Sequence, residues 1–189
     1  MKTALFTTAA LMVLFSFAGC AFMGRPLPVE PRCFDLGALN EKAVEAPAVE
    51  FRSFTDISGN GLRIPRRSAE GTITFEENCR FSAPPAQLIR RRLTELFPVT
   101  AATEAVRVSA VLSRFEIDSA SNSARVLIDY RFSCGEQMKG VRHDITCKIG
   151  SGRNAAAGAM EKCVITSARR LGQEISSFYK SCEKEKVKK

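Results

Sequence analysis

The sequence predicts an α+β fold, with two helices packed on an antiparallel β-sheet. Apolar and polar residues alternate along three consecutive stretches between residues 106 and 149, as they do in antiparallel strands with one buried face. In residues 84–97 and 156–182, apolar residues instead recur at helical spacing. The length of 189 residues fits one ordinary domain with its own hydrophobic core.

The first half of the chain is expected to contribute short strands and the first helix. Ser58-Gly59-Asn60-Gly61 carries the Asn-Gly signal of a tight hairpin, because both residues tolerate positive φ. Pro84-Pro85 suits the first turn of a helix, where no amide hydrogen is needed, and Pro98 ends that helix. The expected strands are 33–39, 49–57, 62–67 and 72–78, with a loop at 40–47. The apolar stripe of the helix is Leu88, Ile89, Leu93, Leu96 and Phe97.

The second half predicts three strands and a long final helix. The alternation in the first strand, 106–117, changes phase after Leu112, which indicates a bulge. Strands at 124–134 and 141–149 follow, with the turn between them expected at Gly135 to Gly140. The helix has the apolar stripe Ala156, Met160, Val164, Ala168, Leu171, Ile175, Phe178 and Cys182. We therefore place the folded domain at 33–182, followed by a charged tail at 183–189.

Residues 1–19 have the layout of a secretory signal peptide. Lys2 precedes an apolar run from Ala4 to Ala18 that is too short for a comfortable membrane span, and the run has no polar face of the kind a buried core helix would show. Residues 17–20, Phe-Ala-Gly-Cys, resemble the bacterial lipobox. This predicts cleavage between Gly19 and Cys20 and attachment of lipid, including acyl chains such as palmitate, to the Cys20 sulfur; ordinary secretion is the alternative.

The expected lipid anchor is followed by a tether. Residues 20–32 hold three prolines and a glycine, a composition typical of an extended segment. Several acyl chains hold a protein stably at a membrane, whereas one chain holds it only marginally. The residue after Cys20 is Ala21. A residue other than Asp at this position implies sorting to the periplasmic face of the outer membrane. The covalent lipid on Cys20 is the only prosthetic group expected.

Six further cysteines raise the question of disulfides. An even number in an exported chain favours disulfides, although buried free thiols are the alternative because at least four lie in apolar stripes. Fifteen pairings are possible and the sequence does not choose among them, although the expected turn disfavours direct pairing of Cys134 with Cys147. No C-x-x-C is present, and the lone His143 excludes a His-ligated metal cluster within one chain, so no metal site is expected. The six are Cys33, Cys79, Cys134, Cys147, Cys163 and Cys182.

No catalytic residue is expected. His143 and Asp144 are neighbours, but in a strand they point to opposite faces, and a packed histidine is favoured over a catalytic base. Glu76 and Glu77 are separated in the same way. The chain also lacks a G-x-S-x-G elbow and a phosphate-binding loop, so we expect neither a serine hydrolase nor an ATPase.

The net charge of +8 suggests an acidic partner. Arginines 90–92 are expected on the polar side of the first helix, and Arg63, Arg66 and Arg67 surround the expected hairpin. Because no aromatic residues are interleaved with them, nucleic acid is not expected as a partner. Lipid head groups or an acidic protein face are better candidates, and a solvated surface is the simplest interpretation of any single arginine.

Several of these segments together resemble the ABC-type transport auxiliary lipoproteins, the group that includes the Pqi-system outer-membrane lipoprotein. The feature that carries most of the resemblance is an aromatic residue followed by Pro-Pro and an amphipathic helix, here Phe81 to Phe97. The matching segments are CFDL (33–36), FTD (54–56), FEENCRFSAPPAQLIRRRLTELF (75–97), SAVLSRFEIDSASNSARVLIDYRF (109–132) and the Ala-rich final helix.

The resemblance implies a non-enzymatic, outer-membrane component of a transport system. In such systems an ATPase and permease work with a protein of the mammalian-cell-entry (MCE) type to move lipids between the two membranes. The implied partners are MCE-type and ABC transporter subunits, with ring-like self-association as a further possibility. The alternative is an envelope lipoprotein with a structural or assembly role unconnected to an ABC transporter; a periplasmic enzyme is a third and weaker interpretation.

Overall fold

The computed structural model describes residues 32–37, 40–97, 105–152 and 154–186. The chain divides into two compact units, Met1–Glu30 and Pro31–Lys189, and every described residue belongs to the second. Gly19 and Cys20, the expected cleavage and lipidation site, lie outside the described residues, as does nearly all of the tether. None of the helices in the described ranges is long and apolar enough to cross a membrane.

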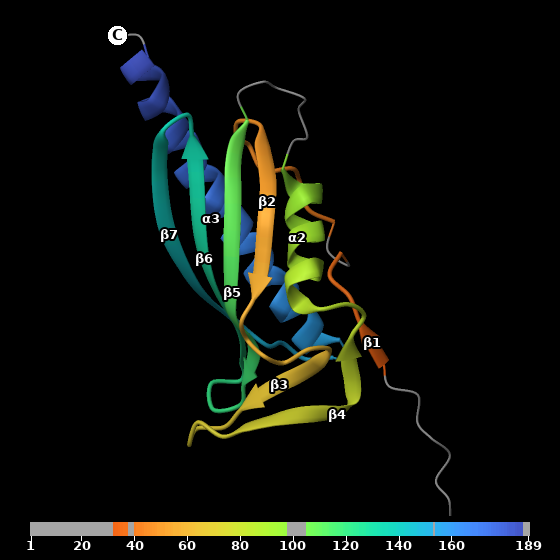
Figure 1. The fold of residues 1–189 in the computed structure, drawn as a ribbon. Coiled ribbons are helices and arrows are strands. Elements are labelled where there is room, and N and C mark those ends of the chain that lie inside the picture. Colours follow the sequence, from red (N-terminus) through yellow and green to blue (C-terminus); the bar gives the residue numbers. More distant parts are fainter. Residues whose placement is uncertain (1–31, 38–39, 98–104, 153, 187–189) are drawn as a thin grey trace, which may run out of the picture. The chain divides into compact units, whose positions relative to one another are not determined.

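The second unit contains one sheet and two helices (Figure 1). The strands are β1 (Arg32–Phe34), β2 (Val49–Asp56), β3 (Arg63–Arg67), β4 (Ile73–Phe81), β5 (Val106–Asp118), β6 (Ser123–Cys134) and β7 (Gln137–Lys148). The helices are α2 (Pro85–Leu96) and α3 (Ala155–Lys186). The predicted α+β class and two helices are therefore confirmed. Residues 183–186 of the expected tail continue α3.

The sheet is mixed, so the prediction of an antiparallel sheet is wrong. Its order is β1-β4-β3-β5-β6-β7, and β2 also pairs with β5. The pairs β1–β4, β2–β5 and β3–β5 are parallel, whereas β3–β4, β5–β6 and β6–β7 are antiparallel. Alternation of apolar residues reports which face of a strand is buried but not the direction of its neighbours. The crossover through α2 makes the parallel pairs of β2 and β3 with β5 possible, and the passage through β2 and β3 does so for β1 and β4.

The Asn-Gly turn does not form the expected hairpin. β2 and β3 lie one after the other along the same edge of β5, where β2 pairs with Val106–Leu112 and β3 with Ile117–Asp118. Between them, Gly59 and Gly61 have φ of 73° and 56° and carry the chain from one strand to the next. The hairpin instead joins β3 to β4, where Ser68 N donates to Thr72 O over 2.9 Å.

The helix α2 follows its predicted boundaries. It begins at Pro85 after Pro84, and it ends at Leu96 because Phe97, which precedes a proline, is extended with ψ of 141°. Its buried face includes Leu88, Ile89 and Leu93. The predicted bulge of β5 is also confirmed, since the β5–β6 register shifts between Leu112 and Arg114.

The turn between β6 and β7 is shorter than expected. Cys134 pairs with Gln137, so the turn consists of Gly135 and Glu136 rather than the whole stretch to Gly140. Gly135 has φ of 61°, as the first position of a type II′ turn requires. The start of β7 escaped prediction because residues 138–140 are all exposed and so show no alternation.

The core lies between the sheet and α3, which runs behind β5, β6 and β7 in Figure 1. Inward-facing residues of the three strands meet the predicted stripe of α3, of which every member but the half-buried Ala156 is buried. Phe132 of β6 meets Phe178 of α3 edge-on with ring centroids 5.1 Å apart. At the other end of the sheet, Phe81 stacks on Phe115 at 5.2 Å.

Gly172 of α3 is expected to be a sensitive position. The loop at 40–47 brings buried Val44 so close that a Cβ on Gly172 would lie 2.3 Å from Val44 Cγ1. We expect Gly172→Ala to lower the free energy of unfolding by about 1–3 kcal/mol, because the added methyl overpacks this contact. Gly158→Ala is the matched control in the same helix, since its Cβ would meet nothing within 4 Å.

Urea denaturation followed by circular dichroism measures both variants. Gly158→Ala should be neutral or stabilising by up to about 1 kcal/mol, the ordinary helix-propensity gain. A Gly172→Ala protein as stable as the Gly158→Ala protein would contradict the close packing of the loop on α3.

Candidate docking face of the sheet

Within the described residues, neither helix covers one face of the sheet. Alternation along β2, β5, β6 and β7 directs one set of side chains toward the helices and the other set outward. In Figure 1 the outward face of these strands is turned to the viewer, with α3 behind them and α2 beside β2. We call this outward face of the four strands the open face.

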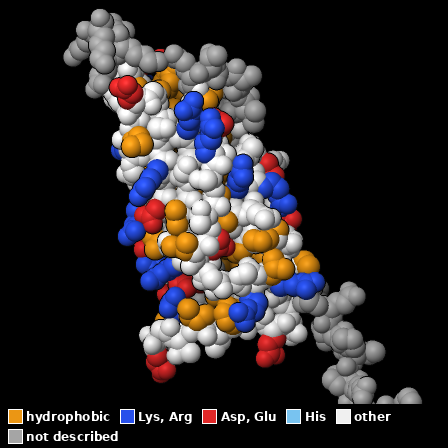
Figure 2. Space-filling model, in the orientation of Figure 1, with side chains coloured by type: hydrophobic (Ala, Val, Ile, Leu, Met, Phe, Trp, Pro, Cys, Tyr) orange, Lys and Arg blue, Asp and Glu red, His pale blue; other side chains and the backbone are white. Residues whose placement is uncertain are grey.

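The open face contains a shallow depression with a volume of about 700 Å³. The residues along its floor are mostly small, which leaves room above the strands. Its lining includes the small residues Ser53, Thr55, Ser109, Ser113 and Gly140, the apolar Ile57 and Val111, and the charged Asp129, Arg131 and Arg142. Figure 2 views this face and shows basic side chains spread across it among apolar, acidic and uncharged ones.

Ion pairs fix the charged side chains of this face. Arg142 of β7 binds both carboxylate oxygens of Asp129 on β6, at 2.6 and 3.1 Å, and Arg125 binds Asp144 in the same bidentate way. The hydrogen bond with Arg125 is the main cause that lowers the pKa of Asp144. Solvent screens such exposed pairs, so they add little to stability and their main effect is to order the surface.

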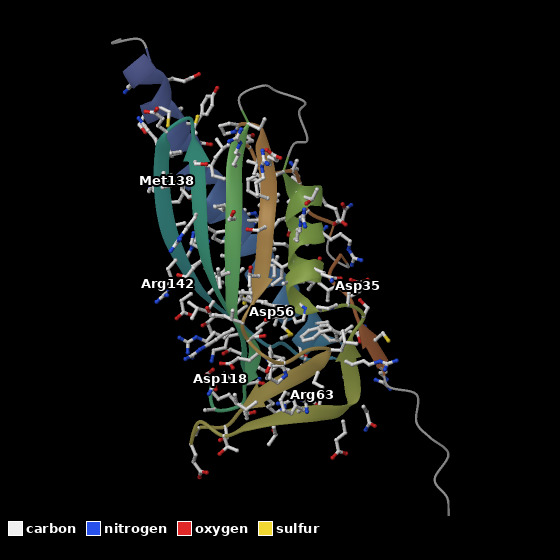
Figure 3. The ribbon with its side chains drawn as sticks, viewed as in Figure 1. Asp35, Asp56, Arg63, Asp118, Met138 and Arg142 are labelled. Atoms are coloured by element: carbon white, nitrogen blue, oxygen red, sulfur yellow. The ribbon has the colours of Figure 1, made fainter. Side chains whose placement is uncertain are left out.

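Two side chains of the open face are left available for a partner. Arg131 is exposed and forms no ion pair with any residue in the described ranges. Met138 of β7 is 83% exposed and lies further along the same strand as Arg142 (Figure 3). An unpaired guanidinium and an exposed thioether chain beside a floor of hydroxyls suit contact with another macromolecule better than they suit a chemical reaction.

His143 and Asp144 point to opposite faces of β7, as predicted. His143 is buried against α3, where its Nδ1 lies 2.9 Å from the Ser167 hydroxyl, which in turn lies 3.0 Å from the Tyr130 hydroxyl. The structure thus places a serine beside the histidine, but both belong to the core and Asp144 is on the other side of the sheet. Glu76 of β4, whose neighbour in the strand is Glu77, pairs with Arg66 of β3.

The burial of His143 predicts a loss of stability in mild acid. Burial, and less strongly nearby Arg170, lower the pKa of His143 from its ordinary 6.5, while Glu174 opposes the shift. Between the lowered pKa and 6.5 the unfolded chain binds more protons, so the free energy of unfolding falls as the pH falls through this window. Urea denaturation from pH 7.5 to 5 checks this result. His143→Gln should show a shallower pH dependence, and an equal slope would contradict the assignment.

Most arginines of residues 90–92 and 63–67 contact other residues of the folded unit. Arg67 binds both carboxylate oxygens of Glu116 at 2.9 Å, and Arg63 lies over the Phe75 ring at 4.0 Å. On α2, Arg91 pairs with Asp35. These contacts direct most of the six arginines toward neighbours within the unit.

Arg92 is buried, so its predicted place on the polar side of α2 is wrong. Its Nη2 lies 3.1 Å from Oε1 of Glu161 on α3, and the two side chains are only 9% and 2% exposed. The sequence contained a signal for this pair, because Arg92 stands four residues after Leu88 and three after Ile89, on the apolar stripe. Glu161 likewise adjoins the stripe residue Met160.

The structure separates the six cysteines into two groups, and no disulfide joins any of them within the described ranges. Cys33 of β1 is exposed and Cys79 of β4 is half-buried. The other four lie in the core on β6, β7 and α3: Cys134, Cys147, Cys163 and Cys182.

Two solved structures share this fold. One is described only as an uncharacterized protein; it has a TM-score of 0.64 and 9% identity, and covers 78% of this chain and 99% of that one. The other, from Xanthomonas campestris and of the DUF330 family, has a TM-score of 0.58 and 12% identity, covering 81% and 95%. No family model and no curated protein sequence matches the chain. At these identities the likeness establishes a common fold.

Proposed function

We propose that this protein is an outer-membrane lipoprotein that acts as a non-catalytic auxiliary component of an ABC/MCE-type lipid transport system. The lipid on Cys20 anchors the protein in the membrane. The Pro-rich segment holds the folded domain at a distance from the lipid, and the open face binds a periplasmic partner. The resemblance to the ABC-type transport auxiliary lipoproteins supports the choice of transport system.

The open face is the observation that carries this proposal. The outward face of β2, β5, β6 and β7, which neither described helix covers, exposes ordered charge pairs, hydroxyls and Met138, while the only serine–histidine contact described lies in the core. An arrangement of this kind suits a protein surface with complementary charges and hydrogen-bonding groups. The MCE-type subunit is the proposed occupant.

The tether sets how far this contact can lie from the membrane. A Pro-rich segment advances about 3.1 Å per residue when extended, so residues 20–32 would reach up to about 40 Å from the lipid surface. The anchored domain can therefore meet a partner that crosses the periplasm without leaving the outer membrane.

The anchor is tested by Cys20→Ser followed by fractionation of the envelope. We expect the variant to leave the outer-membrane fraction, because the serine oxygen does not accept the lipid. Cys33→Ser is the control, since Cys33 belongs to the folded unit and should not affect anchoring. An unchanged outer-membrane location of Cys20→Ser would refute the lipoprotein assignment.

The docking face is tested by photo-crosslinking in cells. A photoreactive residue at Thr55 or Arg131, both exposed on the open face, should capture an MCE-type or transporter subunit. Lys162, exposed on α3, is the control position and should not capture it. Capture of envelope proteins encoded apart from any ABC transporter would favour the structural or assembly role instead, and capture of a second copy would establish self-association through this face.

A further inference from the structure

The four buried cysteines lie where α3 crosses the β6–β7 hairpin, and Cys147 and Cys163 are neighbours at the N-terminal half of the helix. Cys163 Sγ is 3.4 Å from the Ala124 carbonyl oxygen and 3.7 Å from that of Ile145. Ala124 is the cross-strand partner of Cys147, whose side chain is buried on the same face. The Cys163 sulfur therefore lies directly over the strand pair from which Cys147 projects.

The other two cysteines, Cys134 and Cys182, lie near the C-terminal end of α3, each beside Gln137. Phe132 and Phe178 are in contact, and from there Cys134 is two residues on along β6 while Cys182 is four residues on along α3. Both steps advance the chain by about 6–7 Å. Cys182 Sγ also lies 2.8 Å from Oε1 of Gln137, the cross-strand partner of Cys134.

The remaining two cysteines are neighbours that cannot face each other. In the parallel pair of β1 and β4, Arg32 is level with Cys79, and Cys33 is level with Arg80. Residues that are level in a ladder project to the same face, and successive residues project to opposite faces. Cys33 and Cys79 therefore lie on opposite sides of the sheet.

We propose that Cys147 forms a disulfide with Cys163 and that Cys134 forms one with Cys182, which fastens α3 to the β6–β7 hairpin at two points about five turns apart. Cys33 and Cys79 stay reduced. Of the fifteen pairings open to six cysteines, the structure thus selects two bonds and leaves two thiols.

Each bond requires a disulfide oxidant. A cysteine thiolate attacks a sulfur of the oxidant's disulfide and forms a mixed disulfide, and the second cysteine then displaces the oxidant. In total one S–S bond forms in the protein and the oxidant's S–S bond breaks, and the two protons and two electrons of the protein thiols pass to the oxidant, which leaves as its reduced thiols. An exported thiol oxidoreductase, or glutathione disulfide in vitro, is an oxidant of this class.

Burial fixes when this exchange takes place. Burial raises the pKa of the Cys163 thiol far above its ordinary value, and the contact with Cys147 raises it further. Because the thiolate is the reactive form, exchange is slow once α3 has packed. The bonds therefore form before the core closes, and the folded protein should then resist thiol reductants unless a denaturant is added.

Peptide mapping tests the pairing. The mature protein is isolated from cells, its free thiols are alkylated in denaturant without reductant, and it is digested with trypsin. Cleavage after Lys and Arg leaves each buried cysteine in its own peptide: FSCGEQMK (132–139), HDITCK (143–148), CVITSAR (163–169) and SCEK (181–184). We expect two linked products, HDITCK with CVITSAR and FSCGEQMK with SCEK, and alkylation of Cys33 and Cys79 alone.

Alkylation of all six cysteines, or any other linked pair, would overturn the proposal. Cys147→Ala should abolish only the first product and Cys182→Ala only the second, while Cys33→Ala should change neither. Reduction in denaturant followed by refolding without oxidant should lower the Tm by about 10–20 °C. Refolding the purified mature chain with glutathione disulfide should restore both pairs even if Cys20 carries no lipid, which separates this proposal from the proposed function.

Discussion

Glu161→Ala is expected to lower the free energy of unfolding by about 3–5 kcal/mol. The Glu161 carboxylate binds Arg92 of α2 at 3.1 Å and also accepts a hydrogen bond from Gly37 N at 3.0 Å. Its removal takes the buried counter-charge from a guanidinium that is 9% exposed, which then keeps the half-exposed Glu95 carboxylate 3.0 Å from its Nη1, and it releases the segment after β1 from α3. Urea denaturation at pH 7 measures the change. Both proteins are analysed with the same dependence of the free energy of unfolding on urea concentration.

Two comparisons show whether the loss of stability comes from taking the Glu161 carboxylate away from the buried Arg92 guanidinium. Glu174→Ala removes a pair with Lys139 whose side chains are about 40% exposed, and it should cost less than about 1 kcal/mol. Combining Arg92→Leu with Glu161→Leu should recover most of the stability, because apolar groups of similar volume replace both charges. A Glu161→Ala protein as stable as Glu174→Ala would show that water reaches the Arg92 side chain.

Ser167→Ala should destabilise the fold by about 2–4 kcal/mol. The Ser167 hydroxyl is fully buried and is the shared partner of the Tyr130 hydroxyl and of His143 Nδ1. Alanine leaves both groups buried without that partner, and each unsatisfied group costs about 1–3 kcal/mol. The better helix propensity of alanine offsets only about half a kcal/mol.

The neighbouring Thr166 provides the matched control. Its hydroxyl binds Lys162 O within the same helix at an exposed position, so Thr166→Ala should change stability by less than about 0.5 kcal/mol. Adding Tyr130→Phe to Ser167→Ala should recover part of the loss by removing one of the two unsatisfied groups. Equal stabilities of the two alanine variants would mean that Ser167 does not hold this cluster together.

The elements with a strong local period are predictable from sequence. α2 and α3 repeat apolar residues at helical spacing, and β5 and β6 alternate apolar and polar residues, so local burial alone defines them. The bulge in β5 is visible for the same reason, because one extra residue in a strand shifts the alternation after Leu112 to the other phase.

Features that depend on distant parts of the chain are not predictable in this way. The Asn-Gly signal at 58–61 is local and favours a hairpin between β2 and β3. Both strands pair instead with β5, about fifty residues later in the chain, so no hairpin forms there. The prediction for Arg92 is wrong because a charged residue is ordinarily expected on the polar face of a helix. Its position on the apolar stripe and its ion pair with Glu161 of α3 bury it instead. The alternation along β5, β6 and β7 indicates that one sheet face is polar, but no local pattern reports that β2 extends this face along β5.

The tandem placement of β2 and β3 along β5 has a consequence for how the chain matures. A polypeptide that emerges N-terminus first presents β2 and β3 long before their shared partner, Val106–Asp118, becomes available. Until then both strands have unsatisfied edges, which are the groups that recruit other chains. β5, β6, β7 and α3 contact one another at shorter sequence separation and can assemble as soon as they emerge. The N-terminal third therefore depends on the C-terminal part as its template, so a truncation after α2 should yield an aggregating chain rather than a smaller folded one.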